Sequence, residues 1–148
     1  MRRSADVTER GLAYTVPMTT TATTTTATTT SIGAALIERL MAGDSTGATA
    51  LLSPAAQFRA ITPRKFIELS GNADIIATLN NWFRAGWREG LESFEDGSVE
   101  GRQRMRYRVR WSDDYGQRFV FEQQVYYEAD GSGITWLELM CSGYMPLS

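Results

Sequence analysis

The alternation of apolar and polar positions is clearest between residues 98 and 145. Three runs, 98–112, 117–128 and 134–145, repeat with the period of two that is typical of β-strands. In the first run an arginine occupies every second position from Arg102 to Arg110. Because only short turn segments separate the runs, the pattern predicts an antiparallel meander with one cationic face and one largely apolar face.

The turn at residues 113–117 sets how the first two runs pair. A hairpin centred on Tyr115 brings apolar residues opposite apolar residues and arginines opposite glutamates. The expected pairs are Trp111–Phe119, Val109–Phe121, Tyr107–Gln123, Met105–Val125, Arg108–Glu122 and Arg102–Glu128. A slip of one residue would turn every side chain to the other face, so the alternation specifies this register strongly.

Two further turns complete the predicted meander. Asp96-Gly97 is a strong signal for a two-residue hairpin turn, and it would place Phe94 of a strand at 91–95 opposite Val99. Residues 130–133 would connect the second and third runs. The pairs expected there are Val125–Leu137, Gln123–Leu139 and Phe121–Cys141.

Apolar residues recur at helical spacing in two segments near residue 40. The first spans 32–41 and ends at Gly43, because glycine accepts the left-handed conformation that often closes a helix. The second is shorter, is capped by Asp44 or Ser45, and ends before Pro54.

A short strand and a third helix are predicted before the meander. The strand covers 57–61. The helix starts at Asn72 or Asp74, carries an apolar stripe over 75–83, and ends at Gly86. A stripe with this spacing is typical of a helix that packs on a hydrophobic core.

Composition limits the chemistry more than it suggests any. The chain of 148 residues has no histidine, so the commonest general base and the commonest metal ligand are both missing. Its single cysteine, Cys141, forms no internal disulfide and no zinc site by itself. We therefore expect no metal and no other cofactor, and a reducing cytoplasm as the compartment.

The charge balance and hydropathy argue against two classes of partner. The formal net charge is −2, which provides no general attraction to nucleic acid or to an anionic membrane. No segment approaches the roughly 18 consecutive apolar residues of a membrane span. We expect neither a nucleic-acid partner nor a membrane partner.

Residues 1–30 differ in composition from the rest of the chain. From Thr19 to Thr30 the sequence is threonine interrupted only by Ala22 and Ala27, and such a segment has little to bury. We expect a disordered tail, or an upstream start with Met18 as the true first residue; a swapped arm or a modified stalk is the alternative. The single folded domain is then 31–148.

The cationic face of the meander allows three interpretations. The arginines form a solvated outer face, or a surface for a polyanion, or they are turned inward by a bulge to hold an anionic ligand. The outer face also carries a predicted interface for a sheet-to-sheet homodimer, because dense exposed aromatic residues usually mark one. The interface residues are Tyr126, Trp136, Met140 and Tyr144.

The order of elements resembles the nuclear-transport-factor-2-like superfamily over about residues 31–145. The segment 55–63, the helix from Asn72, the Asp96-Gly97 turn and the Gly133-Ile134 start of the last strand carry the resemblance. It implies an α+β fold in which three N-terminal helices pack on a strongly curved antiparallel or mixed β-sheet. Such a fold forms a cone with an internal pocket.

Proteins that share this scaffold include SnoaL-type polyketide cyclases, ketosteroid isomerases, limonene-epoxide hydrolases, dehydratases and members that only bind or assemble. The carboxylate base that the resemblance to a ketosteroid isomerase implies is missing from 58–61. The Arg-x-Asp of an epoxide hydrolase is replaced by Arg108-Val109-Arg110. Chemistry that depends on histidine is excluded, and the fold by itself does not choose among the remaining functions.

The apolar face of the meander is the predicted lining of the pocket. It suits a small, largely uncharged lipophilic or aromatic ligand. The expected ligand-binding residues are Gln103, Met105, Tyr107, Trp111, Phe119, Gln123, Tyr127 and Cys141. If the protein is an enzyme, it is a cofactor-independent isomerase, cyclase or hydratase, with Glu92 as base and Tyr107 or Tyr127 as hydrogen-bond donor.

The same face also allows an interpretation without a ligand. The glutamine and tyrosine side chains satisfy one another inside the cone, and no ligand binds. In that case the protein is an assembly module that acts through the outer face of its sheet.

Overall fold

The computed structural model describes residues 30–83 and 88–148. The predictions of a disordered threonine-rich tail, of Met18 as the first residue and of a helix end at Gly86 fall outside these ranges. None of the described helices is long and apolar enough to cross a membrane.

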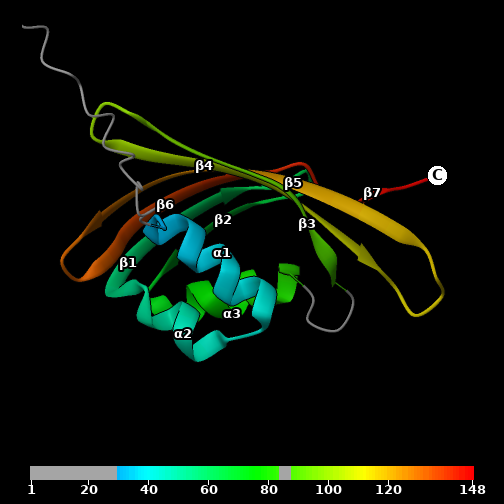
Figure 1. Ribbon diagram of the computed structural model, residues 1–148. Helices are drawn as coiled ribbons and strands as arrows, with labels where there is room; N and C mark the ends of the chain where they lie inside the picture. Colours follow the sequence, from blue (N-terminus) through cyan, green and yellow to red (C-terminus); the bar gives the residue numbers. More distant parts are fainter. Residues whose placement is uncertain (1–29, 84–87) are drawn as a thin grey trace, which may run out of the picture.

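Three helices lie against the concave face of one curved sheet (Figure 1). The helices are α1 (Ile32–Ala42), α2 (Ser45–Ala50) and α3 (Asn72–Phe83). The strands are β1 (Leu52–Ile61), β2 (Phe66–Ser70), β3 (Arg88–Val99), β4 (Arg102–Ser112), β5 (Arg118–Asp130), β6 (Gly133–Cys141) and β7 (Met145–Pro146). The architecture is the predicted α+β class, and the sheet is curved without closing on itself.

The sheet is mixed, with the order β2-β1-β6-β5-β4-β3, and β7 pairs with β5. The pairing of β1 with β6 is parallel, and the other pairings are antiparallel. The predicted short strand at 57–61 is the second half of β1, and β2 was not predicted from the sequence. Strand β2 is a five-residue edge strand without a fully buried residue, so it lacks a strong apolar signal.

Local capping explains where the first two helices begin and end. The hydroxyl of Ser31 accepts a hydrogen bond from the amide of Ala34 (3.0 Å), and the carboxylate of Asp44 accepts one from the amide of Gly47 (2.8 Å). Gly43 ends α1 with φ 73°, a conformation that costs glycine little. The apolar stripes of α1 and α3 are buried against the sheet.

The predicted register of β4 with β5 is confirmed. Trp111 lies opposite Phe119, and the whole series to Met105 opposite Val125 follows as expected. Arg108 lies opposite Glu122, and Arg102 reaches Glu128 in an ion pair of 2.9 Å. The alternation of apolar and polar residues in β4 and β5 therefore predicted correctly which side chains lie on each face of the sheet.

The predicted turn at Asp96-Gly97 is wrong. Strand β3 continues through both residues, and the chain turns at Glu100-Gly101, where Glu100 has φ 52°. Gly97 pairs with Arg104, whose guanidinium Nη2 would lie 2.9 Å from a Cβ at that position. The Arg104 side chain therefore lies over Gly97, within the paired strands and not at a turn.

The predicted register of β5 with β6 is wrong by two residues. The observed pairs are Tyr127–Leu137, Val125–Leu139 and Gln123–Cys141. A β-bulge leaves Thr135 of β6 as an extra residue opposite Glu128 and Ala129 of β5, and Gly133 (φ 114°) begins β6 directly after the turn. Since the shift is even, each side chain keeps the face that the alternation predicted.

Candidate functional site

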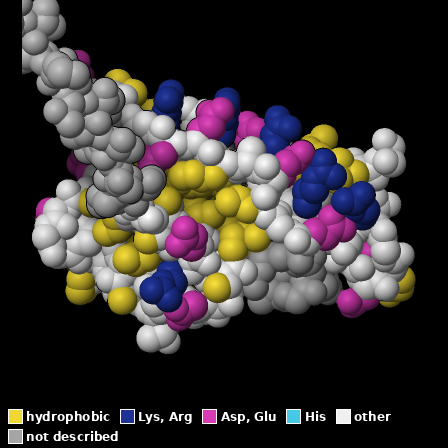
Figure 2. All heavy atoms as spheres, in the orientation of Figure 1, with side chains coloured by type: hydrophobic (Ala, Val, Ile, Leu, Met, Phe, Trp, Pro, Cys, Tyr) yellow, Lys and Arg dark blue, Asp and Glu magenta, His cyan; other side chains and the backbone are white. Residues whose placement is uncertain are grey.

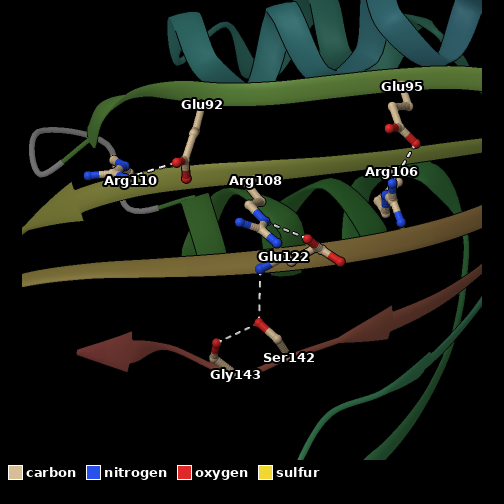
Figure 3. A network of polar contacts seen from close by, with 8 residues as sticks. All are labelled: Glu92, Glu95, Arg106, Arg108, Arg110, Glu122, Ser142 and Gly143. Carbon is tan, nitrogen blue, oxygen red and sulfur yellow. Dashed lines mark hydrogen bonds and ion pairs between the residues drawn. The ribbon is translucent and has the colours of Figure 1, made fainter. Parts of the chain in front are cut away.

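The arginines of β4 lie on the outer, convex face of the sheet, and four of the five, all but Arg104, pair with carboxylates of the described residues. Figure 3 shows three of these pairs: Arg106 with Glu95 (2.7 Å), Arg108 with Glu122 (2.6 Å) and Arg110 with Glu92 (2.9 Å). Positive and negative side chains are accordingly interspersed along one edge of the surface (Figure 2). The inward interpretation of the arginines is wrong, because no bulge in β4 reverses its faces.

Glu92 does not face the interior, so the prediction that it reaches the inner face as a general base is wrong. A register shift between Leu91 and Ser93 changes the phase of β3, and Glu92 lies exposed on the side of Arg110. The hydrogen bond from the Arg110 guanidinium holds the pKa of Glu92 below its usual value. A carboxylate in this setting stays ionised and bound to its partner.

The interior of the cone is packed around a buried polar pair. The hydroxyl of Tyr107 donates to Oε1 of Gln123 at 2.6 Å, and each residue is 1% exposed. Nε2 of Gln123 contacts Sγ of Cys141 at 3.4 Å. The Phe83 ring packs against Tyr107 with ring centroids 5.9 Å apart. Burial raises the pKa of Tyr107, so its hydroxyl remains a neutral donor with an internal acceptor.

Tyr127 closes another part of the interior. Its hydroxyl accepts a hydrogen bond from the amide of Gly33 at the first turn of α1 (3.2 Å). A Cβ at Gly33 would lie 2.6 Å from that hydroxyl oxygen, so glycine is needed for this close approach. Burial raises the pKa of Tyr127.

The other expected ligand-binding residues divide between core and surface. Met105 is 1% exposed, and Trp111 stacks on Phe119 with ring centroids 4.3 Å apart. Gln103 is half-buried. Of the expected residues, Cys141 alone belongs to the described lining of a hollow at the edge of the sheet.

This hollow, here called the rim pocket, has a volume of about 600 Å³. It lies between the turn from β1 to β2 (62–65), the end of α3, and the segment from the end of β6 to β7 (141–145). The lining residues are Thr62, Pro63, Arg64, Lys65, Trp82, Cys141, Ser142, Gly143, Tyr144 and Met145. The volume is within the range of about 300–1,000 Å³ that is usual for small-molecule sites.

Tyr144 belongs to the rim pocket, so its predicted place on the outer face is wrong. Strand β6 ends at Cys141, and Gly143 with φ 80° breaks the alternation of faces before Tyr144. The Tyr144 hydroxyl donates to the carbonyl of Trp82 at 2.6 Å. Its ring meets Trp111 edge-on, with centroids 5.0 Å apart and planes at 89°.

The polar groups of the rim pocket are cationic or neutral. Arg64 and Lys65 are exposed at its edge, and no Asp or Glu is among the described residues that line it. The turn that carries both cations is closed by hydrogen bonds from the amide of Thr62 to the carbonyl of Lys65 (3.0 Å) and from the amide of Lys65 to the Thr62 hydroxyl (3.2 Å). The cations therefore project from a defined loop.

The rest of the predicted interface lies on the outer face. Tyr126 and Trp136 are half-buried, and Met140 is 61% exposed. The Arg102 guanidinium covers the Trp136 ring at 4.5 Å from its centroid. Met140 is paired across strands with Ile61, and Ile61 with Phe66, both also exposed.

Comparison with known proteins identifies the fold. No protein-family model matches the chain, and no match was found among curated proteins. The structure is similar to that of a candidate polyketide cyclase of Xanthomonas campestris pv. campestris, with a TM-score of 0.58 and 18% identity over 74% of this chain and 86% of that chain. The chain has the nuclear-transport-factor-2-like fold.

Two further solved structures share this nuclear-transport-factor-2-like fold. An LEH-like epoxide hydrolase of M. tuberculosis has a TM-score of 0.58 and 16% identity over 75% of this chain and 80% of that chain. A nuclear-transport-factor-2-like protein of unknown function from Cytophaga hutchinsonii has a TM-score of 0.50 and 15% identity over 74% and 96%. Functions this varied on one scaffold leave the function of this chain to its own residues.

Proposed function

We propose that the protein binds a small, largely apolar aromatic or lipophilic molecule in the rim pocket and does not transform it. The observation that supports this most directly is the hollow of about 600 Å³ walled by Pro63, Trp82 and Tyr144. Rings and an aliphatic wall give such a ligand dispersion contacts and remove its apolar surface from water.

The positions of the polar groups favour binding over catalysis. General acid–base catalysis needs a group that is within reach of the substrate and able to change its protonation state. Tyr107 is turned to Gln123, and Glu92 is turned to Arg110. The alternative function, a SnoaL-like isomerase, cyclase or hydratase, would need a carboxylate that the described lining of the rim pocket does not supply.

The single cysteine offers a direct test, because Cys141 lines the rim pocket. We expect that an uncharged aromatic or lipophilic probe, such as 2-naphthamide, progesterone or limonene, slows the alkylation of Cys141 by iodoacetamide. The variant Cys141→Ala shows that the label reports this residue alone. Unchanged alkylation of the folded protein with all three probes at their solubility limits would exclude the proposed function.

We also propose that two copies of the chain pair through the outer face of the sheet. Phe66, Ile61 and Met140 are 56%, 48% and 61% exposed and lie side by side on β2, β1 and β6. Burial of such a row against a second copy is favourable. In this proposal the outer face of the sheet serves assembly and the rim pocket serves binding.

Charge supports a second copy as the occupant of this face. Arg104, Tyr126 and Glu138 lie in one row across β4, β5 and β6. Neither Arg104 nor Glu138 has an ion-pair partner within the described residues. In an isologous dimer through this face, Arg104 and Glu138 of each copy supply opposite charges for a reciprocal pair of contacts between the subunits.

Sedimentation velocity at micromolar concentration tests the dimer. We expect the wild-type chain to sediment as a dimer and Met140→Glu to sediment as a monomer with an unchanged circular-dichroism spectrum. Tyr115→Glu is the matched control, because Tyr115 is 96% exposed in the turn between β4 and β5, away from the apolar row. A wild-type monomer, or a dimer that persists in Met140→Glu, would exclude this interface.

A further inference from the structure

The basic side chains that the structure describes fall into two groups. Seven ion pairs, each with one arginine, are formed within the described residues. Arg64, Lys65 and Arg104 are not among these pairs, although the structure describes all three side chains. Two of these three cations, Arg64 and Lys65, line the rim pocket.

The position of these two cations in the sequence is constrained on both sides. Ile61 and Phe66 pair across β1 and β2, so residues 62–65 form the whole connection between the two strands. Pro63 fixes its own φ within this loop. Both cations are therefore presented by a short closed loop, which lowers the entropy lost when they meet a ligand.

Lys65 also stands at the junction of two hollows. A neighbouring hollow of about 450 Å³ is lined by Lys65, Trp82 and residues of β2 and α3. Lys65 and Trp82 are common to its lining and to that of the rim pocket. A ligand ring that packs on Trp82 therefore shares its hollow with the Lys65 side chain.

We infer that the rim pocket selects molecules whose aromatic or lipophilic body carries one anionic group, with an aromatic carboxylate as the simplest case. This inference rests on the proposed function and specifies its ligand class. The body packs against Trp82, Tyr144 and Pro63, and the anion faces Arg64 and Lys65. A carboxylate accepts charge-assisted hydrogen bonds from both side chains, and the described lining has no acid to repel it.

The same charge distribution argues against a polyanion. A nucleic acid or a polyphosphate needs a continuous row of available cations. On β4 the candidates for such a row, Arg102, Arg106, Arg108 and Arg110, are each held by a carboxylate. Two adjacent cations beside an aromatic wall match one anionic group on a ring.

A matched pair of probes tests the inference: 2-naphthoate and 2-naphthamide share the ring system and differ in charge. We expect the wild-type protein to bind naphthoate about tenfold more tightly than naphthamide at low salt, a ratio in the range of charge-assisted contacts at a partly exposed site. In about 1 M NaCl, where the Debye length is about 3 Å, the preference shrinks.

Variants assign the preference to the loop. The double variant Arg64→Gln, Lys65→Gln is expected to keep the affinity for naphthamide and to bind naphthoate within about twofold of it. Arg104→Gln is the matched control, because it removes an arginine on the outer face that also has no ion-pair partner within the described residues. It is expected to leave the preference unchanged.

The outcomes separate the two proposals. If naphthamide binds and naphthoate binds no better, the inference is wrong and the proposed function stands. A preference for naphthoate that survives in the double variant also overturns the inference, because residues other than Arg64 and Lys65 then bind the carboxylate. If neither naphthalene probe binds, the inference fails, and the alkylation test with progesterone and limonene decides the proposed function.

Discussion

The interior of the cone and the rim pocket are built from the same kinds of side chain but differ in what remains available. In the interior, Tyr107 and Gln123 satisfy each other across paired strands, and aromatic rings fill the space around them. At the rim, Pro63 and Gly143 lie outside the strands and approach each other closely, and a hollow remains beside them. Where strands continue in register, their side chains form a core; where they end, a hollow remains.

The two regions also differ in what their inward polar residues contact. Each inward glutamine or tyrosine is either a ligand contact or half of an internal pair, and the facing strand decides which. Tyr107 faces Gln123 directly in the ladder of β4 with β5, so the internal pair forms. Tyr144 lies beyond the regular end of β6 and therefore reaches the rim.

The largest expected effect is the loss of a ring from the filled interior. Phe83 is 1% exposed and packs between Tyr107 and Phe121. Phe83→Ala should lower the free energy of unfolding by about 3–5 kcal/mol, because the cavity left behind does not close fully. Urea denaturation measures the change, and a loss below about 1 kcal/mol would mean that the interior is not packed as described.

A smaller loss is expected from the buried polar pair. Tyr107→Phe leaves Oε1 of Gln123 buried without its donor, which should cost about 1–3 kcal/mol of stability in the same denaturation experiment. The control adds Gln123→Leu, which removes the stranded acceptor and should restore part of the loss. A double variant less stable than the wild type by the full sum of the two single losses would contradict the pairing.

Ligand binding should depend on Trp82 but not on Trp136, which lies on the opposite face of the molecule. Trp82 lines the rim pocket, and Trp136 lies on the outer face, yet both are half-buried. Trp82→Ala should weaken the binding of 2-naphthamide by about tenfold, since stacking and burial of an aromatic wall contribute about 1–3 kcal/mol. Trp136→Ala should bind like the wild type in isothermal titration calorimetry. Equal losses in the two variants would place the site elsewhere.

The smallest expected effect comes from the ion pairs that the arginines of β4 form on the outer face. Arg108 and Glu122 form a close pair at 2.6 Å but are exposed, with side chains 52% and 36% accessible. Exchanging both for glutamine should lower the thermal unfolding midpoint much less than Tyr107→Phe does, because solvent screens an exposed ion pair. Thermal unfolding of this variant and of Tyr107→Phe measures the two losses of stability. Equal losses would mean that the exposed ion pairs and the buried polar pair contribute alike, contrary to this account.

Sequence patterns predicted the faces of the sheet better than the ends of its strands. Alternation gave the register of β4 with β5 and the outward direction of the arginines, since a one-residue error would bury charge. It misplaced the turn at Asp96-Gly97, because a glycine occurs in turns and also within paired strands, where Gly97 lies under the Arg104 side chain. The bulge at Thr135 in β6 left no signal in a pattern with a period of two.

The rim pocket was less accessible to sequence reasoning than the fold. Its residues come from three separate segments at the ends of elements, where no periodicity operates. Trp82 was assigned to the helical core stripe, and Tyr144 to the outer face by extending the alternation past Gly143. The pair Arg64-Lys65 after Thr62-Pro63 was the available signal, because these cations follow a turn and face no nearby run of acids.

Methyl NMR of methionine provides the most direct test of where a ligand binds. Met145 lines the rim pocket, Met105 is buried in the interior, and Met140 is exposed on the outer face. In a titration with 2-naphthoate we expect the ¹³C-methyl resonance of Met145 to shift with saturation while those of Met105 and Met140 stay in place. A saturable shift of Met105 with Met145 unchanged would place the ligand inside the cone and contradict a site at the rim.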